Sequence, residues 1–175
     1  ATVRHLLSHS SGLNFEGSAQ ISPPGPRRLS SPGGFELIGD LIANRTGTSV
    51  GDYLREAVLA PLDMRGSTVD NQAATGGQGS VRDLIAFARE LLSPTLVDPE
   101  TLGAATSVVF PGLDGVLPGF GRQPANDWGL GFELRDHKRP HWTGDHNSPR
   151  TFGHFGQQGS FLWVDPSIGL ACAAL

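Results

Sequence analysis

Cysteine, lysine and long apolar runs are scarce in this sequence. Cys172 is the single cysteine, so no disulfide can form within the chain, and its small apolar neighbours favour a buried thiol in a strand. No apolar run approaches the length of a membrane span. The formal charge of −4, with both signs interspersed, leaves no basic stripe, so neither nucleic acid nor an anionic membrane is indicated as a partner.

The 175 residues suffice for one ordinary domain, and the order of their periodic patterns predicts an α+β fold. Residues 1–125 carry mainly helical and loop patterns. Residues 126–175 carry strand patterns, several of which we expect to pair antiparallel. The prediction is therefore one domain over residues 1–175, with a helical part followed by a sheet part.

Apolar residues recur at helical spacing in five segments. Ser80 with Asp83 resembles a capping box, and Pro99 suits the first position of a helix. Gly12 and Gly47 stand where helices commonly end in a left-handed residue. The predicted helices run from Thr2 to Ser10–Ser11, from Gly34 to Gly47, from Ser49 to Pro61, over Val81–Leu92 and from Asp98 to Ala105.

Two segments rich in glycine and proline, Asn14–Pro26 and Val108–Pro124, are predicted to be irregular loops. We expect the second loop to line a cleft. Towards the C-terminus the composition becomes typical of strands, and Trp128–Leu134 and Ser160–Val164 are predicted strands. The apolar run Ile168–Leu175 predicts a buried strand.

The opening residues carry the most specific pattern in the chain. Thr2-Val-Arg-His-Leu-Leu-Ser-His-Ser-Ser-Gly-Leu13 closely resembles a segment of serine β-lactamase-related proteins. That family includes class C β-lactamases, penicillin-binding proteins, D-alanyl-D-alanine carboxypeptidases and related esterases. The segment from Thr46 to Met64 resembles the next helix pair of the family, in the same order. The resemblance implies a mainly antiparallel sheet flanked by helices, a helical subdomain, and no metal or organic cofactor.

The nucleophile of that family lies in a Ser-x-x-Lys motif upstream of the opening segment, and this motif does not occur in the chain. Lys138 is the single lysine, and Arg135 stands three residues before it. The chain also ends inside an apolar strand pattern. We therefore expect a chain that is truncated at both ends and lacks its nucleophile.

A histidine flanked by glycines precedes the predicted strand Ser160–Val164. Glycine lets a ligand approach the backbone closely. His154-Phe155-Gly156 resembles the third motif of the family, which is Lys-Thr-Gly in β-lactamases and His-x-Gly in many esterase-like members. The resemblance implies that the N–H of Gln157 forms half of an oxyanion hole. The alternative is a hairpin histidine held by a backbone hydrogen bond.

The middle motif of the family, Tyr-Ser-Asn or Tyr-x-Asn, is degraded here. Alignment on the Gly34–Gly39 segment places Ser30 at the tyrosine, Ser31 at the serine and Pro32 at the asparagine. A serine hydroxyl is shorter and far less acidic than a phenol, and proline offers a substrate neither a polar side chain nor an N–H. Ordinary loop hydroxyls are therefore favoured over a catalytic role for the two serines.

Other histidines are weaker candidates. His137, His141, Asp145 and His146 match no standard zinc spacing and are interrupted by a proline, so solvated loop residues are favoured over a metal site. His5 and His9 lie four apart in the first helix and could form a pair. The resemblance instead implies that these two pack beside the active site.

We expect a fragment of a serine hydrolase that acts on a small ester, amide or peptide substrate through an acyl-enzyme. A histidine in place of the third-motif lysine favours an esterase or peptidase over a true β-lactamase. The alternatives are an inactive binding or regulatory relative, and a fragment with no independent function. The compartment, cytoplasm or cell envelope, and the oligomeric state stay open. The candidate catalytic residues are His154, Gln157 and Ser30, and the candidate substrate-binding residues are Phe155, Gly156 and Pro32.

Overall fold

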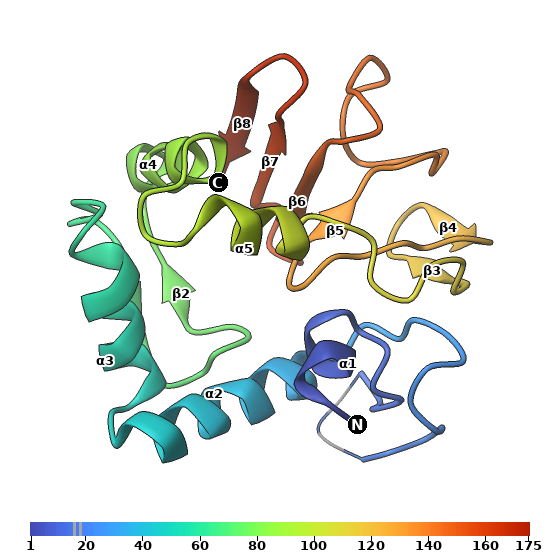
Figure 1. Cartoon of the computed structure of the whole chain (residues 1–175), viewed down its shortest axis with the longest axis horizontal. Helices are drawn as coiled ribbons and strands as arrows, with labels where there is room; N and C mark the ends of the chain where they lie inside the picture. The colour runs from blue at the N-terminus through green and yellow to red at the C-terminus, as the bar shows by residue number, and fades with distance from the viewer. Residues whose placement is uncertain (16, 18) are drawn as a thin grey trace.

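The computed structural model describes residues 1–15, 17 and 19–175, which fold into helices and antiparallel sheets, the predicted α+β class (Figure 1). The helices are α1 (Val3–Leu7), α2 (Pro32–Thr46), α3 (Val50–Leu54), the π-helical turn η1 (Arg55–Leu59), α4 (Val81–Leu92) and α5 (Pro99–Ala105). The strands are β1 (Thr68–Val69), β2 (Gly77–Gln78), β3 (Gly115–Leu117), β4 (Gly121–Gln123), β5 (Glu133–Leu134), β6 (Phe152–Phe155), β7 (Phe161–Asp165) and β8 (Leu170–Ala174).

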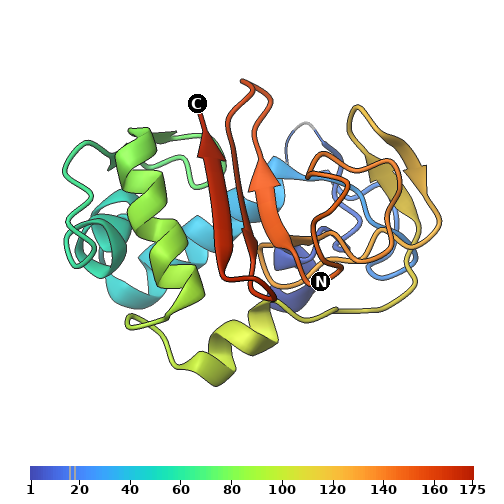
Figure 2. The ribbon, with the colours of Figure 1, turned by 90° about the horizontal axis from the view of Figure 1, so that it is seen from above.

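The main sheet has the antiparallel strand order β5-β6-β7-β8. One row of paired core residues crosses all four strands and ends at Ala171 on β8. Leu134 pairs with Phe152, which pairs with Val164 on the next strand. Helix α4 lies beside this sheet and contributes Ala88 and Leu91 to the same buried cluster (Figure 2). Each fully buried aliphatic or aromatic side chain contributes about 1.5–3 kcal/mol. This cluster therefore fixes α4 against β7 and β8.

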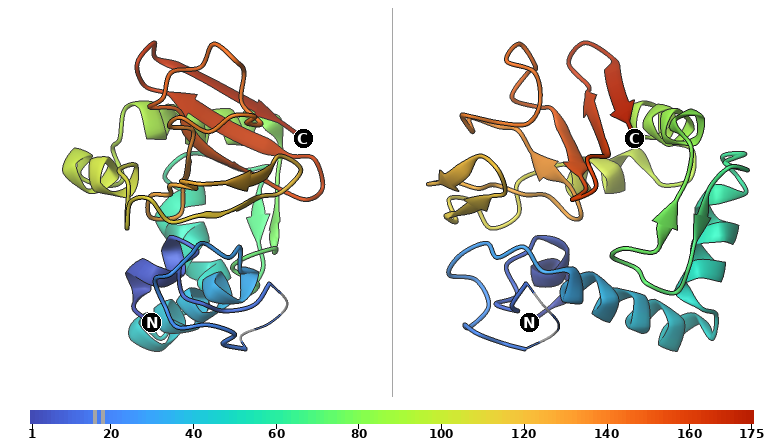
Figure 3. Two further views of the ribbon diagram at one scale, coloured as in Figure 1. Left: turned by 90° about the vertical axis from the view of Figure 1, so that its right-hand side faces the viewer. Right: turned by 180° about the vertical axis from the view of Figure 1, so that it is seen from behind.

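Helices α1 and α2 form a second layer, which Figure 3 shows apart from the main sheet and joined to it through α3 and α4. The two helices approach closely because Gly34 of α2 faces Leu6 of α1. Glu36 of α2 accepts hydrogen bonds from the N–H groups of Ala73 and Ala74, at 3.1 and 3.0 Å. The segment that leads into β2 is thereby held against α2.

The boundaries of two predicted helices differ in the structure. The first helix ends at Leu7, three residues early, because His9 adopts a left-handed φ of 54°. Helix α2 begins at Pro32, two residues early, because the Ser31 hydroxyl caps it by accepting from the Gly34 N–H. Proline has the backbone angle that the first helical position needs. Its missing N–H costs nothing there, because an N–H at that position has no acceptor within the helix.

The predicted loop Val108–Pro124 is only partly irregular, since it contains the β3–β4 hairpin. Its turn is closed by a hydrogen bond from the Phe120 N–H to the Leu117 carbonyl at 2.9 Å. Between them stand Pro118 and Gly119, and the glycine has a φ of 79°. Proline followed by left-handed glycine is typical of a type II turn, so the same residues that suggested a loop form a hairpin.

Two strand predictions also need correction. Of Trp128–Leu134 only the last two residues form a strand, because Gly131 turns the chain with a φ of 84°. The C-terminal strand is not buried: Leu170 is half exposed and Cys172 is only partly buried. Strand β8 is the last in the sheet order and is therefore less covered than β7.

The predicted loop Asn14–Pro26 includes Glu16 and Ser18, which lie outside the described residues. Nearby, Leu13 and Gln20 form an isolated antiparallel bridge. Across the described residues, no helix combines the length and the apolar character that crossing a membrane would require.

Candidate functional site

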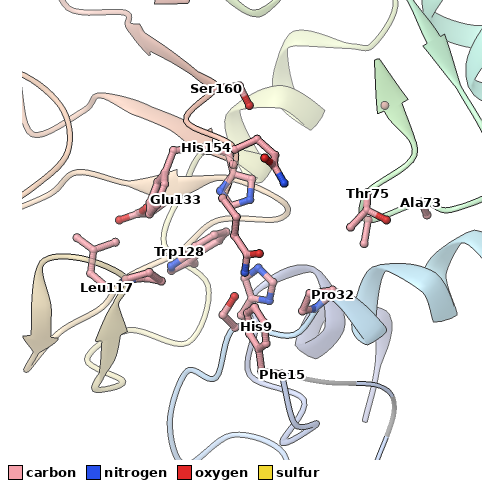
Figure 4. Close-up of a pocket in the computed structure, with 18 of the residues that line it drawn as sticks. His9, Phe15, Pro32, Ala73, Thr75, Leu117, Trp128, Glu133, His154 and Ser160 are labelled. Atoms are coloured by element: carbon pink, nitrogen blue, oxygen red, sulfur yellow. The ribbon is translucent and has the colours of Figure 1, made fainter. Parts of the chain in front are cut away.

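A cleft of about 890 Å³ lies between the layer of α1 and α2 and the edge of the main sheet (Figure 4). The structure brings all six candidate site residues to its walls. Two come from the start of α2 and four from the end of β6 and the turn that follows. These residues are Ser30, Pro32, His154, Phe155, Gly156 and Gln157.

The turn after β6 presents a backbone donor to this cleft. The Gly156 N–H donates to the Ser160 carbonyl at 2.7 Å, and the Gly159 N–H donates to the Gly156 carbonyl at 3.1 Å. The N–H of Gln157 has no acceptor among the residues that the structure describes. A Cβ on Gly156 would lie 2.8 Å from the Ser160 hydroxyl, so a larger residue there would require the Ser160 side chain to move. Within the described residues, the N–H groups of Gln157 and Gln158 in this turn form no hydrogen bond.

His154 extends into the cleft from β6 (Figure 4). Its ring meets the edge of the Trp128 ring, with 5.6 Å between the centroids. Within the described part of the chain the ring forms no hydrogen bond, so the backbone bond expected of a structural hairpin histidine is not seen there. Partial desolvation by the cleft walls lowers the pKa of His154. The side chain nevertheless remains accessible to solvent. The neutral ring is therefore favoured at pH 7.

The residues at the middle-motif positions mainly build the start of α2. Ser31 is buried, its hydroxyl caps the helix, and its N–H donates to Nδ1 of His9 at 3.2 Å. The prediction of an ordinary loop hydroxyl is therefore wrong for Ser31. Ser30 is exposed and lies on the cleft wall, and Pro32 is the first helical residue beside it.

His9 lines the cleft itself. The resemblance had implied only that it packs beside the site. It is 5% exposed and lies between two aromatic rings, with centroids 4.6 Å from Trp128 and 5.2 Å from Phe35. Burial, reinforced by the nearby His154 and Arg28, lowers the pKa of His9 to about 3. Because Nδ1 accepts a hydrogen bond, the proton of the neutral ring belongs on Nε2.

Arg28 anchors the segment that carries Ser30. Its buried guanidinium donates to the carbonyls of Ser8, Val109 and Phe110, and it lies 4.0 Å from the Asp127 carboxylate. Burial lowers the pKa of Arg28 to about 10, and the charge of Asp127 opposes that shift. The arginine stays charged at pH 7, and both of its terminal nitrogens are bonded to protein carbonyls, whereas its Nε–H is buried without a partner among the described residues.

A buried polar cluster lies behind the sheet wall. Glu133, which has no exposed side-chain surface, accepts hydrogen bonds from Lys138, His141 and Trp142. Burial alone would raise the pKa of Glu133, but these hydrogen bonds and the Lys138 charge outweigh it and lower the pKa. The cluster corrects the prediction of solvated loop histidines, because the His141 side chain is 2% exposed.

The other members of that predicted group do not join His141. His137 is 86% exposed in its side chain and pairs with Asp136. Within the described residues, no three His, Cys, Asp or Glu side chains are grouped so that they could hold a metal ion.

Sequence reasoning missed Trp128 and Glu133, which stand on the cleft wall beside His154 (Figure 4). The only signal for Glu133 was an acidic residue inside an apolar strand pattern. Trp128 was treated as a strand residue, whereas its isolated bridges to Val109 and Glu133 turn it towards the cleft.

Comparison with known proteins places this chain in a family. The family model described as beta-lactamase matches residues 1–175. A beta-lactamase from Mycobacterium bovis superposes with a TM-score of 0.96 at 49% identity, over 99% of this chain and 65% of its own. This chain therefore spans 65% of the length of that relative. None of the curated proteins compared matches it.

Two more distant structures share the fold alone. A D-amino acid amidase from Ochrobactrum anthropi, complexed with D-phenylalanine, gives a TM-score of 0.74 at 21% identity over 98% of this chain and 63% of its own. A mutant simvastatin synthase from Aspergillus terreus gives 0.77 at 18% identity over 98% and 61%. With the family model matching from end to end, the chain belongs to the beta-lactamase family.

Proposed function

We propose that these residues form part of the acyl-transfer site of a serine hydrolase. The observation that carries the proposal is that Gln157 lines the cleft and its N–H has no acceptor among the described residues. A preorganised N–H directed at a developing oxyanion stabilises a tetrahedral intermediate, and the loss of one such donor typically costs about 10²–10³ in kcat. The proposal requires a nucleophilic serine and its lysine from outside residues 1–175, where no Ser-x-x-Lys occurs.

The substrate class that the cleft favours is a neutral ester or amide with an apolar group. Apolar walls come from both layers, through Phe15, Leu117 and Trp128. The lining groups Arg28 and Glu133 carry charge, but each is already bonded within the protein. A carboxylate-bearing substrate would therefore find no free cation on the part of the wall that the structure describes. An esterase is favoured over a β-lactamase on this ground.

His154 is the residue best placed to handle a proton in the cleft. A neutral imidazole can accept a proton at one nitrogen and donate from the other. Its lowered pKa favours that neutral form at pH 7. Ser30 is exposed in the cleft but lacks the acidity of a phenol, so we assign it no proton transfer.

One observation favours a second function, a binding protein that has lost its chemistry. Pro32 and Ser31 serve the start of α2, so neither is free to take the role of the family's middle motif. Such a protein would keep the cleft and bind the same neutral ligands without turning them over.

The decisive experiment uses the protein expressed from its complete reading frame. We expect hydrolysis of p-nitrophenyl butyrate with a burst of p-nitrophenol, and covalent labelling of one serine by a fluorophosphonate. Gln157→Pro removes the N–H and should lower kcat about a hundredfold, whereas Gln157→Ala keeps the N–H and should retain activity. Absence of both burst and label would refute the hydrolase and favour the binding protein.

A further inference from the structure

The buried carboxylate of Glu133 does more than the pairing of β5 with β6 requires. In that pairing Glu133 lies opposite Gly153, and backbone hydrogen bonds are sufficient to hold it. Its side chain is nevertheless fully buried with three side-chain donors, Lys138 and His141 on one oxygen at 3.1 and 3.0 Å, and Trp142 on the other at 2.8 Å. Burying a charged pair is often no more stabilising than an apolar replacement, so stability alone is a weak explanation for this cluster.

The third donor leads from this cluster to the cleft. The Trp142 ring lies against the ring of Phe155, with centroids 5.4 Å apart, and against Phe161 at 6.2 Å. The same ring stacks on His141, with 5.4 Å between the centroids and an interplanar angle of 28°. The indole therefore has one position, fixed by the bond from its N–H to Glu133 and by these neighbouring rings.

Phe155 is the residue directly before the turn that presents the Gln157 N–H. It ends β6, and the glycine that follows has no side chain to hold it. The turn itself is closed by the bonds from the Gly156 N–H to Ser160 and from the Gly159 N–H to Gly156, and Phe155 pairs with Phe161 at its base. The packing of Trp142 on Phe155 is thus the contact through which the buried cluster reaches the turn.

We propose that Glu133, acting through the N–H of Trp142, is a positioning residue that fixes Phe155 and thereby the orientation of the Gln157 N–H. The inference rests on the proposed function only for its catalytic consequence. Its structural part, that the bond between Glu133 and Trp142 sets the turn, holds for a binding protein as well. A misplacement of about 1 Å at such a donor can cost up to about a hundredfold in rate.

The test compares Trp142→Phe with wild type in the protein expressed from its complete reading frame. This variant keeps an aromatic ring against Phe155 but removes the N–H that Glu133 accepts. We expect kcat for p-nitrophenyl butyrate to fall about tenfold with KM within twofold, and the ¹H–¹⁵N resonances of Gly156 and Gln157 to shift. His137→Ala, an exposed histidine of the same loop, is the matched control and should change none of these.

Two further readouts keep the inference testable. Glu133→Gln should shift the same resonances, and if it fails to fold, Trp142→Phe alone decides. Unchanged amide resonances and unchanged kcat in a folded Trp142→Phe variant would overturn the inference. If the wild-type protein hydrolyses no ester, the proposed function fails, while the resonances of Gly156 and Gln157 still decide whether the bond positions the turn.

Discussion

The two walls of the cleft are held in different ways. On the helical wall, Arg28 binds carbonyls that lie 20, 81 and 82 residues away in sequence. On the sheet wall, Glu133 binds donors that lie five to nine residues away. The helical wall therefore depends on the closure of the whole fold, whereas the sheet wall is held by one local loop. We therefore expect substitutions in the helical wall to lower the stability of the whole fold. Substitutions in the sheet wall should loosen mainly the surrounding loop.

The largest effect should follow Arg28→Met. This substitution removes a buried cation from three carbonyls and from Asp127, and breaking such a network typically costs about 3–5 kcal/mol. Urea unfolding followed by circular dichroism should show this loss. Arg27→Met, at an exposed neighbouring position, serves as the control and should stay within about 0.5 kcal/mol of wild type. A loss below about 1 kcal/mol for Arg28→Met would contradict the comparison.

The second effect is a loss of stability on acidification through His9. Its pKa is about 3 in the folded protein and about 6.5 when unfolded, so the unfolded chain binds the proton first as the pH falls. Its stabilising contribution is complete above pH 6.5, and about 2 kcal/mol should be lost between pH 6.5 and 4.5.

His9→Asn isolates this contribution. Asparagine tolerates the left-handed backbone at this position and its side-chain oxygen can accept a hydrogen bond, but it does not titrate. The midpoint temperature of thermal unfolding should be measured at pH 7.0, 5.5 and 4.5. As the pH falls, it should drop less steeply for the variant than for wild type. Equal slopes in the two proteins would show that His9 is not buried in its neutral form.

The smallest effect should follow Lys138→Met on the sheet wall. The variant loses the bonds from Lys138 to Glu133 and to the Asp127 carbonyl. Glu133 keeps its donors His141 and Trp142, and an ammonium group is no longer buried. We expect a loss of about 1–2 kcal/mol in urea unfolding, clearly less than for Arg28→Met. Hydrogen exchange should speed up mainly in residues 133–142. A loss as large as that of Arg28→Met would mean that the two walls are not held differently.

Local signals in the sequence predicted the helices well where a capping residue and an apolar period coincide. Helix α4 occupies Val81–Leu92 as predicted, and Ser80 caps it by accepting from the Asp83 N–H. The predicted helix start at Gly34 was wrong because Ser31 and Pro32 were weighed as a degraded motif. Read as a cap followed by proline, the same two residues indicate the observed start.

Part of the candidate site could also be predicted from the sequence. The resemblance placed His154, Gly156 and Gln157 next to one another in sequence, and neighbours in sequence must be neighbours in space. The resemblance also predicted that His9 packs beside the site. It could not show that the ring lies on the cleft wall against Trp128, 119 residues further along the chain.

The sequence by itself determined the family, the α+β class and most helix positions, because capping, periodicity and motif order are properties of contiguous residues. Only the tertiary structure decided which charges are free. Arg28, Glu133 and Lys138 were not among the predicted site residues, yet each is buried with partners. Burial and pairing depend on which distant segments meet when the core closes. That closure leaves a cleft whose described walls include the unbonded N–H of Gln157 and two charged side chains, Arg28 and Glu133, that are already bonded within the protein.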